Sequence, residues 1–181
     1  VIGFDIDSSI ISSLEIHGHF QGTTDPTLLG KANLVIIAVP TPLDGARKPD
    51  LSAVHAACKT IIENVKKPVL IINESTSYPG TVRNLIMPLI GSLSNEKFEH
   101  LYAISPERVD PGNNTWNTKN TPKILGGITE PCKIKGLEFY NKVFDKVVPV
   151  QNTEAAELVK VYENTFRMIN IALANELSQV C

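Results

Sequence analysis

Two charged side chains in the stretch ISPERVDPGNN are candidates for catalysis. An apolar run ends at Ser105, and Glu107 and Arg108 follow in a segment that proline and glycine hold in a turn. A carboxylate at a strand end can act as a general base, and a neighbouring arginine can orient that carboxylate or a substrate anion. A surface ion pair between the two residues is the competing interpretation.

A second candidate pair, Lys160 and Asn164, lies in the stretch EAAELVKVYENTFRMINIALANE. Residues four apart share one face of a helix, so both side chains can donate hydrogen bonds to one oxyanion. Arg167 lies three residues further along, on the same side. A solvated polar stripe is the alternative, because Glu157 and Glu163 are each three residues from Lys160.

Two other apolar runs are followed by short segments that could contact a ligand. They are residues 74–76, in ESTSYPGT, and residues 39–41, in AVPTPLD. Ligands of an open parallel sheet gather at the carboxyl ends of its strands, where small hydroxyl groups let a flat ring approach. A polar strand-to-helix turn explains the first stretch equally well, and a proline-stiffened loop explains the second.

The opening VIGFDID places Asp5 at the end of an apolar run, with Asp7 two residues later. In a dinucleotide-binding fold, an acid at the end of the second strand accepts hydrogen bonds from the adenosine ribose, about 20 residues after a glycine-rich phosphate loop. No such loop precedes Asp5 in this sequence. Asp5 is therefore either a ribose acid whose loop lies outside the sequence or an ordinary carboxylate at a strand end.

Apolar runs alternate with amphipathic segments along most of the chain, and strands that alternate with helices favour an α/β fold. We expect a parallel sheet with helices on both faces. The expected strands are residues 1–6, 33–40, 68–75, 101–107, 123–127 and 146–150, and the expected helices are residues 50–65, 81–93 and 131–144.

The segment from Thr153 to the chain end has the period of one long helix, roughly 40 Å long at 1.5 Å per residue. From Phe166 onward it is apolar on more than one face, so we expect it to pack on a second domain or subunit. The chain thus divides into a sheet domain, residues 1–152, and the start of a linker helix, residues 153–181.

Composition excludes several classes of protein. The chain has 181 residues, a net charge of −2, 20% charged and 43% hydrophobic residues, without the basic excess of a nucleic-acid-binding protein or an apolar run of membrane-spanning length. Its three cysteines, Cys58, Cys132 and Cys181, form no C-x-x-C pair. They argue against a disulfide framework or a metal site, and they fit a cytoplasmic protein.

Six segments together are similar to those of the nucleotide-sugar 6-dehydrogenases, in order and at most of the spacings. They are VIGFDID, VIIAVPTPLD, ESTSYPGT, SPERVDPGN, PKILGG and AAELVKVYENTFRMINIALANEL. The resemblance is closest to the branch that acts on UDP-N-acetylhexosamines. It implies a Rossmann-type NAD domain, followed by a long helix that leads to dimerisation and UDP-binding domains, in a homodimer or larger assembly.

The resemblance also implies a reaction: two NAD-dependent steps oxidise the C6 alcohol of a UDP-sugar to a carboxylate, through a thioester on a cysteine, for surface polysaccharide synthesis. The expected sugar nucleotide is UDP-N-acetyl-D-glucosamine, with UDP-N-acetylmannosamine and UDP-glucose as alternatives. Glu107 resembles the base for thioester hydrolysis, and Lys160 and Asn164 resemble the oxyanion donors. The residues that resemble the NAD contacts are Asp5, Val39, Pro40, Thr41, Ser75 and Thr76, and those that resemble the substrate contacts are Arg108, Val109 and Arg167.

The sequence departs from the family in three places. The first strand and its G-x-G-x-x-G loop are absent from the sequence. The segment of residues 8–21 is shorter than the corresponding segment of the family. The nucleophilic cysteine of the family belongs to a GGHC-like motif that would lie beyond Cys181. We therefore expect the chain to be a partial, inactive portion of a dehydrogenase. A nucleotide-binding Rossmann module without catalytic activity is the alternative from another class.

Overall fold

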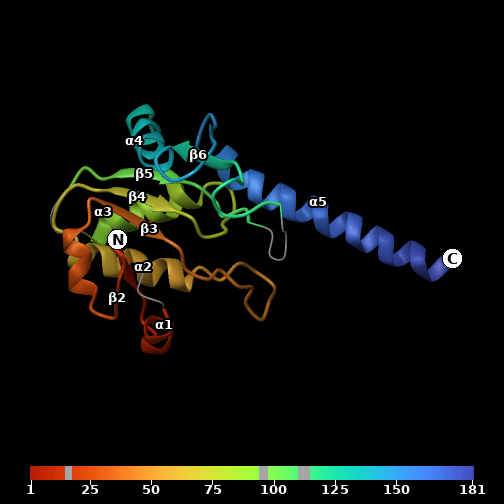
Figure 1. Ribbon diagram of the computed structural model, residues 1–181, viewed down its shortest axis with the longest axis horizontal. Helices are drawn as coiled ribbons and strands as arrows, with labels where there is room; N and C mark the ends of the chain where they lie inside the picture. Colours follow the sequence, from red (N-terminus) through yellow and green to blue (C-terminus); the bar gives the residue numbers. More distant parts are fainter. Residues whose placement is uncertain (15–17, 94–97, 110–114) are drawn as a thin grey trace.

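The computed structural model describes residues 1–14, 18–93, 98–109 and 115–181 (Figure 1). The strands are β1 (Ile2–Phe4), β2 (Gln21–Thr23), β3 (Leu34–Ile37), β4 (Leu70–Asn73), β5 (Leu101–Ile104), β6 (Lys123–Gly127) and β7 (Val147–Pro149). The helices are α1 (Ser8–Ser13), η1 (Pro26–Lys31), α2 (Ser52–Asn64), η2 (Val82–Ile86), α3 (Met87–Leu93), α4 (Glu130–Tyr140) and α5 (Thr153–Val180). The short elements α1, β2 and η1 were not expected from the sequence.

Five strands form one sheet in the order β3-β4-β5-β6-β7. β3, β4 and β5 pair in parallel, but β6 is antiparallel to β5 and β7 is parallel to β6. The expected parallel sheet is present in β3, β4 and β5, whereas β6 and β7 run in the opposite direction to them. A parallel return needs a crossover back to the opposite edge of the sheet. The described residues between Ile104 and Lys123 include no helix, so the chain enters β6 from the edge where β5 ends.

β1 and β2 form a separate parallel sheet of two strands, so the expected strand at residues 1–6 does not join the larger sheet. In the Rossmann strand order 3-2-1-4-5-6, the strand that carries the ribose acid is separated from strand 4 by strand 1. β1 and β3 are likewise not paired with each other, and Ile36 of β3 is 39% exposed.

Helices cover both faces of the five-stranded sheet, as expected (Figure 1). α2, η2 and α3 pack over a core that includes Ile37, Ile71 and Ile104, and α4 packs on the other face over Ile72 and Leu125. Side chains alternate along a strand, so Ile71 and Ile72 enter different cores. The packing leaves the carboxyl ends of β3, β4 and β5 at one edge of the sheet.

The long helix α5 begins at Thr153, as expected, and is capped by Asn152, whose side chain accepts the N–H of Ala155 at 2.8 Å. Its first turns pack on the sheet domain, where Ala156 is fully buried. The rest of α5 projects from the body of the molecule (Figure 1). The large apolar side chains along this part of α5 are exposed, for example Tyr162 at 67% near its start and Val180 at 84% at its end.

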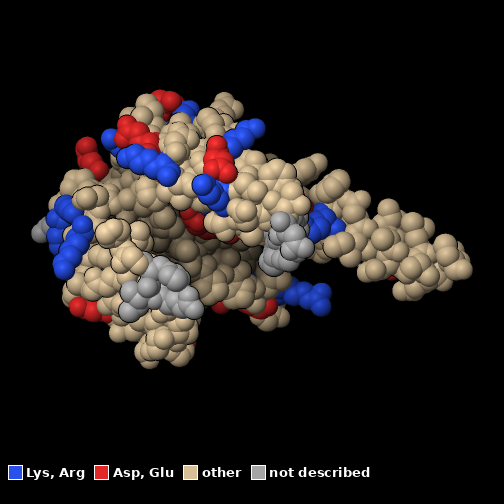
Figure 2. Space-filling view, in the orientation of Figure 1, with Lys and Arg blue, Asp and Glu red and all other residues tan. Residues whose placement is uncertain are grey.

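The surface of the body differs from that of the projecting helix. Figure 2 shows acidic and basic side chains spread over the body, whereas the projecting part of α5 carries almost no charged side chains. From Met168 to Cys181 the only charged residue is Glu176. Within the described ranges, no helix has both the length and the apolar character to cross a membrane.

A buried carboxylate fixes α5 on the sheet domain. Glu157 is 1% exposed, and its two oxygens accept the backbone N–H groups of Gly80 at 2.5 Å and Val82 at 2.9 Å. These donors lie at the start of η2, where helical N–H groups lack partners within the helix. Beside this contact, Arg83 donates to Glu154 at 2.5 Å. Glu157 is therefore not part of a solvated stripe, and it sets the position of α5 relative to the strand ends.

We expect Glu157→Ala to lower the free energy of unfolding by about 2–3 kcal/mol, because two buried N–H groups lose their acceptors. Glu176→Ala, on the projecting end of the same helix, is the matched control and should change it by less than about 0.5 kcal/mol. Urea unfolding followed by circular dichroism measures both. Equal destabilisation by the two substitutions would show that the Glu157 contact does not hold the helix.

Candidate functional site

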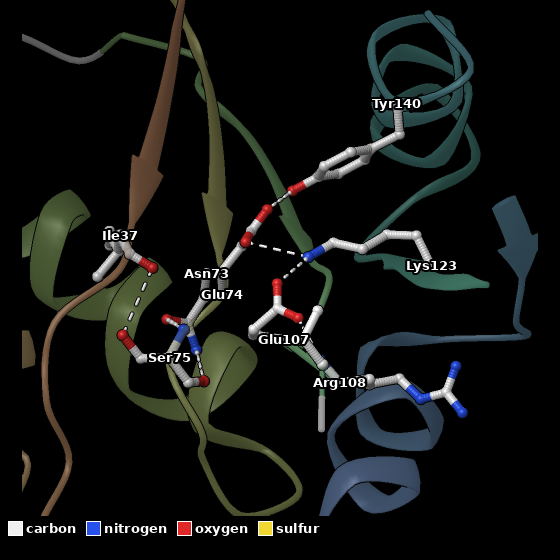
Figure 3. A network of polar contacts seen from close by, with 9 residues as sticks. Ile37, Asn73, Glu74, Ser75, Glu107, Arg108, Lys123 and Tyr140 are labelled. Carbon is white, nitrogen blue, oxygen red and sulfur yellow. Dashed lines mark hydrogen bonds and ion pairs between the residues drawn. The ribbon is translucent and has the colours of Figure 1, made fainter. Parts of the chain in front are cut away.

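The carboxyl ends of β3, β4 and β5 lie side by side, and Val39, Ser75 and Ser105 follow them as expected. Ser75 is 5% exposed and joins two of the three ends. Its hydroxyl donates to the carbonyl of Ile37 at 3.4 Å (Figure 3) and accepts the N–H of Val39 at 2.8 Å, a bond outside that view. The Asn73 amide donates to the Ser75 carbonyl at 3.2 Å. The turn after β4 is thereby fixed against the loop after β3.

Asp5 lies directly after β1 and is held there by the backbone. Its N–H donates to the carbonyl of Thr23 at 3.2 Å, and its carboxylate accepts the N–H of Asp7 at 2.9 Å. Among the other expected NAD contacts, Val39 and Thr41 are half-buried, while Pro40 and Thr76 are exposed. A carboxylate for ribose hydroxyls and small, fixed strand-end turns for a flat ring suit a dinucleotide. These residues fit NAD, and their individual contacts with it remain predictions.

Glu107, the expected base, is held by three donors. Its Oε1 accepts the N–H groups of Arg108 at 2.8 Å and Val109 at 2.7 Å, and its Oε2 is 3.4 Å from Nζ of Lys123. Burial acts to raise the pKa of Glu107, but the Val109 N–H, the Lys123 charge and the Arg108 N–H hold that pKa below its ordinary value. Because the side chain is also 48% exposed, the carboxylate is ionised at neutral pH and open to solvent.

The Arg108 side chain does not pair with Glu107, so the suggestion of an ion pair between the two is wrong. Its guanidinium points away from Glu107 (Figure 3) and binds both carboxylate oxygens of Glu163, with Nε at 2.9 Å from Oε2, and donates to the carbonyl of Pro122. A fork of this kind matches the planar geometry of arginine. Arg108 therefore ties the end of β5 to α5, and any contact with substrate remains a prediction.

The partner of Glu107 is Lys123, which the sequence did not single out. Lys123 is the first residue of β6, and its Nζ is 3.0 Å from Oε2 of Glu74 as well as 3.4 Å from Glu107 (Figure 3). The Tyr140 hydroxyl donates to the other oxygen of Glu74, and burial together with the Glu74 charge raises the pKa of Tyr140. The sequence did contain a sign of this contact: Lys123 begins the apolar strand KILGG, and a lysine buried in such a strand requires an acidic partner.

Three expected site residues lie on α5. Lys160 is half-buried, whereas Asn164 and Arg167 are exposed. Burial lowers the pKa of Lys160 most, followed by the charge of Arg167, while Glu107 and Glu163 act in the opposite direction. The charge of Glu107 thus acts on the pKa of Lys160, and their expected convergence in one site remains a prediction. No hydrogen bond joins Asn164 to either residue, so its expected place beside them remains a prediction.

A groove of about 620 Å³ runs along α5 next to these residues. Both arginines expected to contact substrate, Arg108 and Arg167, contribute to it. Its lining consists of Arg108, Tyr162, Glu163, Phe166, Arg167, Asn170, Ile171 and Ala174. Two arginines and one glutamate thus lie beside an open apolar surface, and Arg108 is paired with Glu163.

Two family models match the chain in succession. Residues 1–148 match the NAD binding domain of the UDP-glucose/GDP-mannose dehydrogenase family, and residues 154–181 match its central domain. The UDP-N-acetyl-D-mannosamine dehydrogenase of Salmonella typhimurium is 34% identical over 208 residues, which cover 100% of this chain and 49% of that protein. The NDP-N-acetyl-D-galactosaminuronic acid dehydrogenase of Ralstonia solanacearum is 34% identical over 185 residues, 98% of this chain and 43% of that protein.

Solved structures have the same fold. The UDP-D-ManNAc dehydrogenase of Pyrococcus horikoshii superposes with a TM-score of 0.83 at 33% identity, over 97% of this chain and 47% of that one. A UDP-glucose dehydrogenase of Pyrobaculum islandicum gives 0.84 at 22% identity, which shows a shared fold alone. The chain spans about half the length of the relatives it matches. The expected Rossmann-type fold and the expected NAD cofactor are confirmed.

We expect Ser75→Ala to destabilise the protein by about 1–3 kcal/mol, because the Val39 N–H loses its acceptor in a half-buried turn. Hydrogen exchange at the Val39 amide should become faster in the same variant. Ser92→Ala removes an exposed hydroxyl from α3 and serves as the control. Urea unfolding and amide exchange by NMR measure the two effects, and unchanged exchange at Val39 would contradict the role given to Ser75.

Proposed function

Since the chain belongs to the UDP-glucose/GDP-mannose dehydrogenase family, we propose that its site serves the NAD-dependent oxidation of the C6 alcohol of a UDP-sugar to the uronic acid. The activity belongs to the whole protein, of whose relatives this chain spans about half. The observation that carries the proposal is the fixed, solvent-open carboxylate of Glu107 at a strand end, within electrostatic reach of Lys160.

Glu107 and the donors on α5 have separate tasks in this proposal. Lys160 and Asn164 donate hydrogen bonds to the oxygen on C6 as negative charge develops there, and Glu107 takes a proton from the water that opens the thioester. The lowered pKa of Glu107 keeps this base ionised at neutral pH. The Glu157 contact and the Arg108–Glu163 fork hold α5, and hence the donors, near the ends of β4 and β5.

NAD, when bound, would accept one hydride from C6, and a second NAD molecule, bound after the first has left, would accept the other. We assign its ribose to Asp5, the loop beneath it to residues 39–41, and the turn beside the nicotinamide ring to Ser75 and Thr76. Ser75 keeps the two strand-end turns at a fixed spacing through its bond to Val39. The surface offered to the cofactor is thus set before it binds.

The nucleophilic cysteine of the proposal is none of the three in this chain. Cys58 and Cys132 are buried, and burial raises the pKa of Cys58 to about 11, so its thiol is not ionised at neutral pH. The Cys132 sulfur accepts the N–H of Tyr102 at 3.4 Å inside the sheet domain. Cys181 is exposed at the far end of α5.

A UDP-N-acetylhexosamine is the proposed substrate, and UDP-N-acetylmannosamine is the form named for the relatives in Salmonella, Pyrococcus horikoshii and Staphylococcus aureus. The expectation of UDP-N-acetyl-D-glucosamine is not supported by these names and remains a prediction. We propose a cytoplasmic homodimer or larger assembly, in which a second copy or a further domain covers the exposed apolar side chains of α5.

We expect Glu107→Gln in the full-length protein to slow thioester hydrolysis more than the oxidation steps, so that a covalent sugar adduct accumulates on the nucleophilic cysteine. Intact-protein mass spectrometry after mixing with NAD and each UDP-N-acetylhexosamine detects it. Glu138→Gln, an exposed carboxylate on α4, is the control and should carry no adduct. Near-normal turnover without an adduct in Glu107→Gln would leave Glu107 as a surface carboxylate, whereas no turnover in the unsubstituted full-length protein would favour a nucleotide-binding module.

Lys160→Ala should lower turnover about 100-fold, because an oxyanion donor acts mainly in the transition state. NAD affinity should change far less. Lys59→Ala, an exposed lysine of α2, is the matched control. Steady-state kinetics and NAD titration separate the two effects, and a loss of NAD affinity as large as the loss of turnover would contradict the role of Lys160.

A further inference from the structure

Lys123 is a buried charge to which the proposed reaction gives no task. Its side chain is 4% exposed, and every residue of β6 is buried. An ammonium in such a place loses its hydration, and this loss is offset only where carboxylates or other acceptors replace water. A fold retains a buried lysine at low cost only if its partners are held as firmly as the lysine itself.

The partners of Lys123 come from three other elements. Its Nζ is 3.0 Å from Glu74 at the end of β4 and 3.4 Å from Glu107 after β5. It also lies over the rings of Tyr140, at 5.5 Å, and Phe144, at 5.2 Å. Tyr140, on α4, donates to the remaining oxygen of Glu74. Figure 3 shows the ammonium next to both carboxylates, of which Glu74 is 17% exposed and Glu107 48% exposed.

We propose that Lys123 is the positioning residue of Glu107: it fixes Oε2 of that carboxylate and ties it, through Glu74, to the turn that carries Ser75. The inference rests on the role proposed for Glu107 in hydrolysis. Oε1 of Glu107 is already held by two backbone N–H groups, so the bond to Lys123 removes the remaining rotation of the carboxylate.

Other charged and titratable groups also face Glu107. They are Glu74 from β4, Tyr140 from α4, Arg108 on its own segment and Lys160 from α5. Arg108 is committed to Glu163, and Lys160 forms no ion pair with another described residue. Among the described residues, Lys123 is the cation whose charged group lies within 4 Å of the Glu107 carboxylate. Removal of its charge should therefore change the pKa of Glu107 more than removal of Arg108 or Lys160.

The antiparallel direction of β6 makes this contact possible. β6 begins at the edge where β4 and β5 end, so its first side chain lies beside the residues that follow those strands. A parallel β6 would place the same lysine at the opposite edge of the sheet. The departure from a wholly parallel sheet therefore brings Lys123 to the site.

Lys123→Met in the full-length protein tests the proposal by two readouts. With 13C-labelled glutamate and Glu107→Gln for assignment, NMR titration should show the Glu107 midpoint moving to higher pH. Single-turnover hydrolysis of the thioester should slow about 10-fold at neutral pH, with its acid limb moved in the same direction and the KM for NAD unchanged. Lys123→Arg should restore most of the rate, and Lys119→Met, an exposed lysine four residues upstream, should change neither readout.

The double variant Glu74→Gln/Lys123→Met removes both charges of the buried pair and keeps the test valid if the single variant does not fold. An unchanged Glu107 midpoint in a folded Lys123 variant would overturn the proposal. A shifted midpoint in Lys123→Met, combined with no adduct in Glu107→Gln, would instead overturn the proposed function of Glu107 and leave the positioning contact in place.

Discussion

A buried ammonium needs carboxylates within ion-pair distance, and this constraint holds the ends of β4 and β5 next to the start of β6. Lys123 draws Glu74 from the end of β4 and Glu107 from the segment after β5 to one point. Glu74 precedes Ser75, whose hydroxyl in turn holds the loop after β3. Three strand ends and the head of β6 are thus connected by charge and hydrogen bonds. The proposed cofactor surface and the proposed base therefore share one rigid support.

A second buried carboxylate, Glu157, fixes α5 on the sheet domain, as Glu74 helps to fix the strand ends. It accepts two backbone N–H groups at the start of η2, and the Arg108–Glu163 fork adds a contact six residues further along the helix. Lys160 lies between these two anchors in sequence. In the role proposed for Lys160, a donor to a developing oxyanion works best when it is positioned beforehand, and these contacts fix the helix that carries it. Beyond them α5 presents apolar side chains that a partner surface could cover.

Local pattern predicted much of this arrangement. The apolar runs located β3, β4 and β5, and the turn chemistry after them located Val39, Ser75 and Glu107. The helical period placed Lys160 and Arg167 on one side of α5. The hydrophobic pattern could not predict the direction of β6, because a parallel and an antiparallel buried strand have the same run of apolar residues. Nor could it pair Lys123 with Glu74, 49 residues earlier, or assign Arg108 to Glu163, since such contacts depend on tertiary packing.

The most direct test of the account is a crystal structure of the full-length protein with NAD and its UDP-sugar. The quantities to measure are the distances from C6 and its oxygen to the Glu107 carboxylate and to Nζ of Lys160. We expect Lys160 within hydrogen-bonding distance of that oxygen, at about 3 Å, and Glu107 within that distance directly or through one water. A sugar bound with C6 on the far side of α5 from Glu107, or with Lys160 turned away from it, would contradict the account.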